Sequence, residues 1–149
     1  MRIIISIVIL LFSALLGINT YQKYSKNEKK ARLLYQFSNA LAENNRSKLE
    51  GFCSVLTEII PETSELKKTD EALEYINKEF SSVVGFDDIF PMICGLTTCG
   101  SFDIEAKAEA LAERSEAAYE KQKELLIKNG KSAIVLFPGI ALMMLILLI

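Results

Sequence analysis

The chain begins and ends with apolar segments that carry no charged side chain. Residues Ile3–Ile18 read IIISIVILLFSALLGI, and residues Ser132–Ile149 read SAIVLFPGIALMMLILLI. At about 1.5 Å per residue, a helix of either segment covers most of the roughly 30 Å hydrocarbon core of a bilayer. Nearly all the charge lies between Lys23 and Lys131. We therefore predict a transmembrane helix at each end, within residues 1–21 and 132–149.

Each terminal segment also has an alternative interpretation. Arg2 followed by an apolar run is compatible with a cleaved signal peptide, but no A-x-A-like site closes the run. Helix-forming sequence instead continues from Lys23 to Ala42. The C-terminal run has no polar face, which argues against a buried helix of a soluble domain. Pro138 and Gly139 are tolerated in membrane helices, and we expect a kink near Pro138.

Basic side chains flank both apolar segments on the side of the middle domain, residues 22–131. They are Lys23, Lys26, Lys29, Lys30 and Arg32 after the first segment, and Lys121, Lys123, Lys128 and Lys131 before the second. Because positive residues near membrane spans stay in the cytoplasm, the middle domain is predicted to be cytoplasmic, with both termini across the cytoplasmic membrane. Tyr21 and Tyr24 occupy positions where aromatic rings favour the membrane interface.

The cysteine and histidine content limits the chemistry of the chain. There are three cysteines and no histidine, so the thiols cannot all pair within one chain and a usual zinc site lacks ligands. We interpret Cys53, Cys94 and Cys99 as reduced thiols in a reducing compartment. Cys94 and Cys99 are expected to pack inside the helical domain, with a redox switch as the alternative. No metal and no cofactor are predicted.

Helix signals dominate the middle domain, and the predicted fold class is all-α, an antiparallel helical bundle joined to the two spans. The first helix is expected to run from the membrane to about Glu43. The other expected helices run from an S-x-x-E capping box at Ser47–Glu50 to before Pro61, from a Thr69–Asp70 cap to about Gly85, from about Asp87 to Cys99, and from Ser101–Asp103 to at least Lys128.

The last of these helices carries a narrow seam of residues spaced alternately by four and three. The seam residues are Ile104, Ala108, Leu111, Ser115, Ala118, Gln122 and Leu125. Such spacing is typical of a coiled coil, and small seam residues let another helix approach closely. The expected partner is the first helix, through Ala31, Leu34, Ser38 and Leu41. A homodimer contact through the same seam is the alternative.

The sequence shows no catalytic motif. It has no G-x-S-x-G turn and no glycine-rich phosphate loop. Asp87, Asp88, Asp103 and Glu105 could pair as general acid and base, but acidic residues near helix starts are ordinarily helix-stabilising caps. We therefore predict that the chain is not an enzyme and has no small-molecule substrate. The net charge of −2 is spread over mixed positions, which argues against nucleic-acid binding.

Three segments carry a resemblance to a known family. They are GINTYQKYSKNEKKARLL after the first span, CGSFDIEAKAE with its Gly100–Asp103 step into the long helix, and YEKQKELLIKNGKSAIVLFPGIALMMLILLI at the end. In this layout the whole chain resembles the stage III sporulation protein AB family, relatives of the inner-membrane F component of type II secretion systems. The chain differs from that family at Asn44–Arg46, where a tight turn containing proline is usual.

The resemblance implies a function that composition does not show. It implies a non-catalytic platform in the outer forespore membrane, part of a channel-like complex of stage III sporulation proteins that includes a secretion-type ATPase. The platform would couple the ATPase to membrane partners, with Asp103 and Glu105 as candidate partner-binding residues. The alternative is a membrane-anchored helical hairpin that acts as a structural or dimerisation protein, a possible homo-oligomer, with no secretion role.

Overall fold

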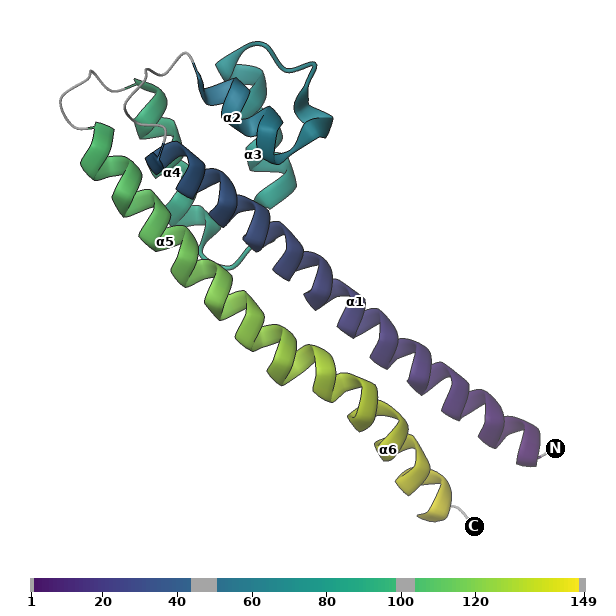
Figure 1. The fold of residues 1–149 in the computed structure, drawn as a ribbon. Helices are drawn as coiled ribbons and strands as arrows, with labels where there is room; N and C mark the ends of the chain where they lie inside the picture. The colour runs from purple at the N-terminus through teal and green to yellow at the C-terminus, as the bar shows by residue number, and fades with distance from the viewer. Residues whose placement is uncertain (1, 44–50, 99–103, 148–149) are drawn as a thin grey trace. The chain divides into compact units, whose positions relative to one another are not determined.

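A computed structural model describes residues 2–43, 51–98 and 104–147 (Figure 1). Within these ranges every regular element is a helix, so the all-α class predicted from the sequence is confirmed. The elements are α1 (Arg2–Glu43), α2 (Phe52–Ile59), the 3-10 turn η2 (Pro61–Thr63), α3 (Thr69–Phe80), α4 (Phe86–Thr98), α5 (Ile104–Leu125), the π-helix η3 (Leu126–Lys131) and α6 (Ser132–Leu147).

The chain divides into two compact units. The first, here called the apolar unit, comprises Met1–Glu28 and Lys123–Ile149. The second, the charged unit, comprises Lys29–Gln122. The apolar unit therefore contains the first part of α1 together with η3 and α6, and the charged unit contains α2, α3, α4 and most of α5.

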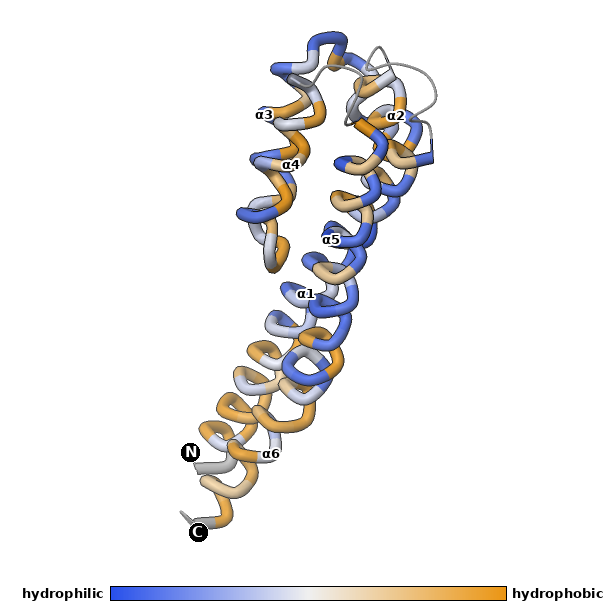
Figure 2. The backbone as a smooth tube through the Cα atoms, turned by 90° about the vertical axis from the view of Figure 1, so that its left-hand side faces the viewer, coloured by the Kyte–Doolittle hydropathy of each residue, from blue (hydrophilic) through white to orange (hydrophobic). Residues whose placement is uncertain are grey.

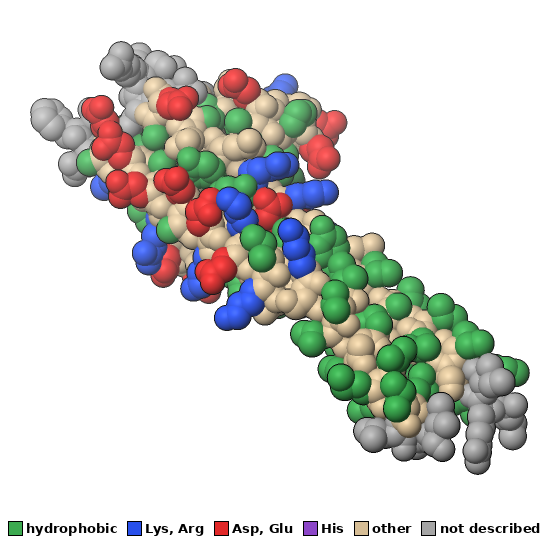
Figure 3. Space-filling view, turned by 60° about the horizontal axis from the view of Figure 1, so that its bottom comes forward, with side chains coloured by type: hydrophobic (Ala, Val, Ile, Leu, Met, Phe, Trp, Pro, Cys, Tyr) green, Lys and Arg blue, Asp and Glu red, His purple; other side chains and the backbone are tan. Residues whose placement is uncertain are grey.

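The apolar unit carries large hydrophobic side chains on its surface. Leu15 is 63% exposed in α1, and Met143 is 68% exposed in α6. Hydrophobic residues predominate along the ends of α1 and α6 (orange in Figure 2), and hydrophobic side chains make up much of this unit's surface in the view of Figure 3. Soluble proteins rarely expose so large a contiguous apolar surface. The structure thus contains two helical stretches, Ile4–Glu43 and Ile104–Ile146, that are long and apolar enough to cross a membrane.

Inside the apolar unit, α1 and α6 pack closely through small residues. A Cβ atom added to Gly17 would lie 2.8 Å from the carbonyl oxygen of Ala133. Further along the pair, Asn129 Nδ2 donates a hydrogen bond of 3.4 Å to the hydroxyl of Tyr24. The contact moves forward along α1, from Gly17 to Tyr24, and backward along the C-terminal segment, from Ala133 to Asn129. The two segments are therefore antiparallel. Small residues at such a contact allow the close backbone approach that favours helix pairing in membranes.

The chain remains helical past Lys128, as expected, but it changes hydrogen-bond pattern. The α-helical part of α5 ends at Leu125, and residues Leu126–Lys131 form a π-helix. Gly130, a weak helix former, lies in this segment and is buried. A Cβ atom at Gly130 would lie 3.2 Å from Cβ of Tyr24. The wider turn therefore occurs where the second segment makes room for an aromatic residue of α1.

The charged unit has a single apolar core built from its five α-helical segments. The most deeply buried large side chains include Phe37 of α1, Leu56 of α2, Ile76 of α3, Ile93 of α4 and Leu111 of α5. Phe37 meets Phe52 edge to face, with ring centroids 5.4 Å apart. Burying these side chains removes apolar area from water, which is the main favourable term in folding.

The seam predicted for the last helix is buried within the chain. Its five central residues, Ala108, Leu111, Ser115, Ala118 and Gln122, are buried, whereas Ile104 and Leu125 at its ends are half-buried. Ser115 contacts Ser38 of α1, and Tyr119 stacks on Tyr35 with ring centroids 5.9 Å apart. In the charged unit, too, α1 and α5 are therefore antiparallel neighbours, and Ser115 of the seam faces the chain's own first helix.

The starts of the shorter helices differ from those expected. Helix α2 begins at Phe52, after Gly51, which makes no side-chain cap. The predicted capping box Ser47–Glu50 lies outside the described residues. Thr69 is the first residue of α3 and not its cap; Lys68 has the extended backbone of an N-cap, and its carbonyl accepts the first helical bond, from Ala72. The prediction of a Thr69 cap is wrong because the acidic residues after Thr69 favour the first turn itself.

Candidate functional site

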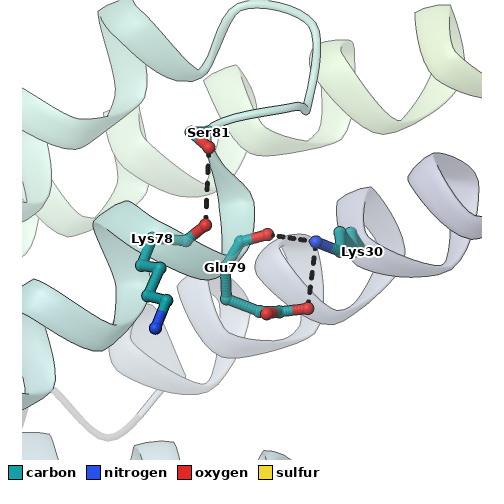
Figure 4. Close-up of polar contacts among 4 residues, drawn as sticks. All are labelled: Lys30, Lys78, Glu79 and Ser81. Carbon is teal, nitrogen blue, oxygen red and sulfur yellow. Dashed lines mark hydrogen bonds and ion pairs between the residues drawn. The ribbon is translucent and has the colours of Figure 1, made fainter.

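Lys30 of α1 joins the C-terminal end of α3 (Figure 4). Its Nζ atom lies 3.0 Å from Oε1 of Glu79 and donates a hydrogen bond of 2.6 Å to the Glu79 carbonyl oxygen. The last carbonyls of a helix lack partners within the helix and favour a nearby cation. The Ser81 hydroxyl also donates to the Lys78 carbonyl, at 3.4 Å. Lys30 and Ser81 together therefore complete the end of α3.

The position of Lys30 corrects the sequence interpretation. The sequence grouped Lys30 with the basic residues that flank the first apolar segment, but its side chain is only 16% exposed and is paired inside the charged unit. The ion pair with Glu79 spans 49 positions of the chain, a separation that no local pattern reveals. The exposed neighbours Lys29 and Arg32 are compatible with the original interpretation.

A buried polar contact fixes how α1 meets α5. The Ser38 hydroxyl donates to the Leu34 carbonyl oxygen at 2.8 Å, and its oxygen also lies 2.8 Å from Oγ of Ser115. A hydroxyl has one proton, so Ser115 is the donor in the second bond. Near the other end of the pair, Gln122 Oε1 accepts a bond of 3.5 Å from the Val84 backbone amide. Because a buried polar group is costly when unpaired, the Ser38–Ser115 contact favours one register of α1 against α5, and the Gln122 contact holds α5 to the segment between α3 and α4.

The acidic positions considered for catalysis or partner binding lie on the surface or outside the described residues. Asp87 and Asp88 are in the first turn of α4, and Asp88 forms a 3.0 Å ion pair with Arg114. Both partners of that pair are more than half exposed, so the pair contributes little stability. Glu105 is exposed in the first turn of α5, and Asp103 lies outside the described residues. Within the part of the chain that the structure describes, no group of His, Cys, Asp and Glu side chains could hold a metal ion.

Two of the three cysteines are described, and both are free thiols that are half-buried. Cys94 is therefore less enclosed than expected, and Cys99 lies outside the described residues. Burial raises the pKa of the Cys53 thiol, and the nearby Glu71 carboxylate raises it further. Cys53 lines an open depression together with Ser54, Thr57, Glu58, Leu66 and Lys67. A raised pKa leaves less of the reactive thiolate at neutral pH, so Cys53 is a weak nucleophile there.

The raised pKa predicts slow alkylation of Cys53. In a Cys94→Ser/Cys99→Ser chain, the maleimide reaction rate should rise with pH at a higher midpoint than that of an unhindered cysteine peptide. Glu71→Gln should lower the midpoint only part of the way, because burial is the larger cause and persists. Quenching the reaction at timed intervals and measuring the adduct, at several pH values between neutral and alkaline, gives the midpoint with and without Glu71→Gln. A midpoint at or below that of the peptide would contradict the burial of this thiol.

In the apolar unit, the polar contact between Tyr24 and Asn129 is the second candidate site. Tyr21 and Tyr24 were expected at the membrane interface, and both side chains pack beside Gly130. No sequence pattern predicted a role for Asn129 or a contact of Gly130 with these tyrosines. The available signal was the Asn-Gly pair between two lysines just before the apolar segment, which is unusual inside a helix.

Comparisons with protein-family models, with curated proteins and with solved structures each give no match. The resemblance to the sporulation family is therefore carried by the residues of this chain alone.

Proposed function

We propose that this chain is a non-catalytic membrane platform, in which the apolar unit is anchored in the cytoplasmic membrane and the charged unit receives a protein partner in the cytoplasm. In this proposal the charged unit is an antiparallel helical bundle. The observation that carries the proposal is the separation of surfaces. Among the described residues, the large hydrophobic side chains that are exposed all belong to the apolar unit.

The two surfaces suit two different solvents. Side chains such as Phe12, 62% exposed, and Val135, 73% exposed, would be poorly solvated in water, and a lipid environment removes that cost. The charged unit instead encloses its apolar side chains in one core and carries more acidic than basic residues. An acidic surface favours a partner with a basic face, because opposite potentials speed association and suppress wrong partners.

By its resemblance to the sporulation family, the proposed complex is a stage III sporulation secretion channel, with a secretion-type ATPase as the partner. The platform would pass force from the ATPase to membrane partners through α1 and the α5–η3–α6 stretch, both of which are helical from one unit into the other. Glu105, which is exposed, is a candidate for contact with the ATPase. Asp103 is a second candidate, on the basis of the sequence. The competing function is a structural hairpin without a secretion partner.

Membrane anchoring and ATPase association are tested separately on the full-length chain. The chain should remain with membranes after carbonate extraction. A single cysteine at exposed Ser54, in a chain with the native cysteines replaced by serine, should react with an impermeant maleimide only after the cells are opened. Labelling of this cysteine in intact cells, or release of the chain by carbonate, would contradict the anchored cytoplasmic arrangement.

Partner binding is tested by co-isolation from the native host. The platform function predicts that a secretion-type ATPase co-purifies with the chain and that Asp103→Lys/Glu105→Lys weakens this association. The matched control, Glu109→Lys/Glu113→Lys, makes the same charge change at two exposed positions of α5 and should retain the ATPase. Recovery of the chain without any ATPase would favour the structural hairpin, and equal loss in both variants would remove Asp103 and Glu105 as specific contacts.

A further inference from the structure

We propose that four lysines of the apolar unit bind the headgroups of anionic phospholipids. These residues, here called the basic patch, are Lys23, Lys26, Lys128 and Lys131. The inference rests on the proposed function, in which the apolar unit lies in a bilayer. It goes beyond that function by naming a ligand, a phosphate-bearing lipid headgroup, and the side chains that bind it.

The patch is assembled by the contact between Tyr24 and Asn129. Lys23 and Lys26 flank Tyr24 in α1, while Lys128 and Lys131 flank Asn129 in η3. Since the hydrogen bond of 3.4 Å between Tyr24 and Asn129 brings the two segments together at one level, all four lysines lie near that level. All four are exposed. Positions more than a hundred residues apart in the chain thus supply four exposed cations at one level of the apolar unit.

The patch lacks an internal counter-charge. The apolar unit contains only two acidic residues, Glu28 and Glu124, against its six basic residues. Within residues 2–43, 51–98 and 104–147, none of the four lysines makes an ion pair of 4.0 Å or less. Cations at one level of a helix pair without acidic partners raise the local positive potential, which favours an anionic ligand.

The depth of the patch favours lipid headgroups over a soluble anion. Lys23 follows the exposed apolar residue Ile18 by five positions, and Lys131 precedes the exposed Ile134 by three. These separations correspond to about 7.5 Å and about 4.5 Å along a helix. The polar layer on each face of a bilayer is about 5–8 Å thick, and lysine stems extend along apolar surface with the ammonium in the polar layer. In Figure 3, blue side chains lie beside the green surface.

Lipid selectivity of the reconstituted full-length chain tests the proposal. Vesicles of phosphatidylcholine, with or without phosphatidylglycerol, carry either spin-labelled phosphatidylglycerol or spin-labelled phosphatidylcholine at trace level. The wild-type chain should bind labelled phosphatidylglycerol about fivefold more strongly than labelled phosphatidylcholine. This factor corresponds to the binding free energy of one lysine near a charged membrane surface. Replacing all four patch lysines by glutamine should reduce the ratio toward one, and replacing them by arginine should preserve it.

A matched control variant carries glutamine at four lysines of the charged unit, Lys67, Lys68, Lys78 and Lys107, and should keep the preference. Equal loss in that control would overturn the assignment to the patch. Loss of the preference on adding inorganic phosphate would also overturn it, in favour of a site for a soluble anion. A chain that stays in the vesicles after carbonate but shows no preference refutes this inference alone, whereas a chain washed off refutes the proposed function itself.

Discussion

Replacing Phe37 with alanine is expected to lower the free energy of unfolding of the charged unit by about 3–5 kcal/mol. Phe37 is 1% exposed in the core and meets Phe52 edge to face at an interplanar angle of 83°. Truncation would remove buried apolar area and leave a cavity that the surrounding helices can fill only in part. Urea denaturation of the full-length chain in detergent, followed by circular dichroism, measures the change.

The matched control for this prediction is Phe12→Ala. Phe12 is 62% exposed in the apolar unit, so the same substitution there removes no packed core and should leave the unfolding of the charged unit nearly unchanged. If both alanine variants unfolded at the same denaturant concentration, the side chain of Phe37 would not be a core residue.

The second large effect is expected for Gly17→Leu, which should separate the two apolar helices. The first added carbon would lie 2.8 Å from the Ala133 carbonyl oxygen and 3.2 Å from Cα of Ile134. Both are backbone atoms, so the helices must move apart, at a cost of about 1–3 kcal/mol of pairing. The readout is a disulfide between Tyr24→Cys and Gly130→Cys in a chain whose native cysteines are replaced by serine. Residue 130 would place its Cβ 3.2 Å from that of residue 24, close to disulfide spacing.

Oxidative cross-linking of that cysteine pair should be fast in the parent and several-fold slower with Gly17→Leu. Gly139→Leu provides the control, because a Cβ atom at Gly139 meets no heavy atom within 4 Å. It adds the same side chain to the partner helix and should leave cross-linking unchanged. Equal rates in the Gly17 and Gly139 variants would contradict the close contact at Gly17.

The sequence predicted those features that repeat along a helix. The alternation of four and three from Ala108 to Gln122 identified the buried seam, because a helix places such positions on one face. The apolar runs likewise predicted two helices long enough to cross a membrane. Features that depend on one distant contact were missed. The pairing of Lys30 with Glu79 requires knowledge of where α3 ends in space, and the π-helix depends on packing of Gly130 against Tyr24.

The candidate site was less predictable for the same reason. Tyr21 and Tyr24 follow an apolar run, so a general rule about aromatic residues at interfaces selects them. Asn129 gains its role only through a hydrogen bond to a residue far away in the sequence. The start of α3 illustrates a smaller difficulty. Threonine and aspartate are favoured both as caps and in the first turn, and sequence alone did not decide between the two positions.

The π-helix also determines how α6, which follows it, is rotated about its own axis. An α-helix advances about 100° per residue, so one residue more or fewer in the Leu126–Lys131 segment would rotate α6 by about that angle about its axis. Ala133, now against Gly17, would then turn away and bring bulkier side chains into the gap. The length of this short segment, more than the composition of α6, therefore determines which face of α6 its neighbour meets.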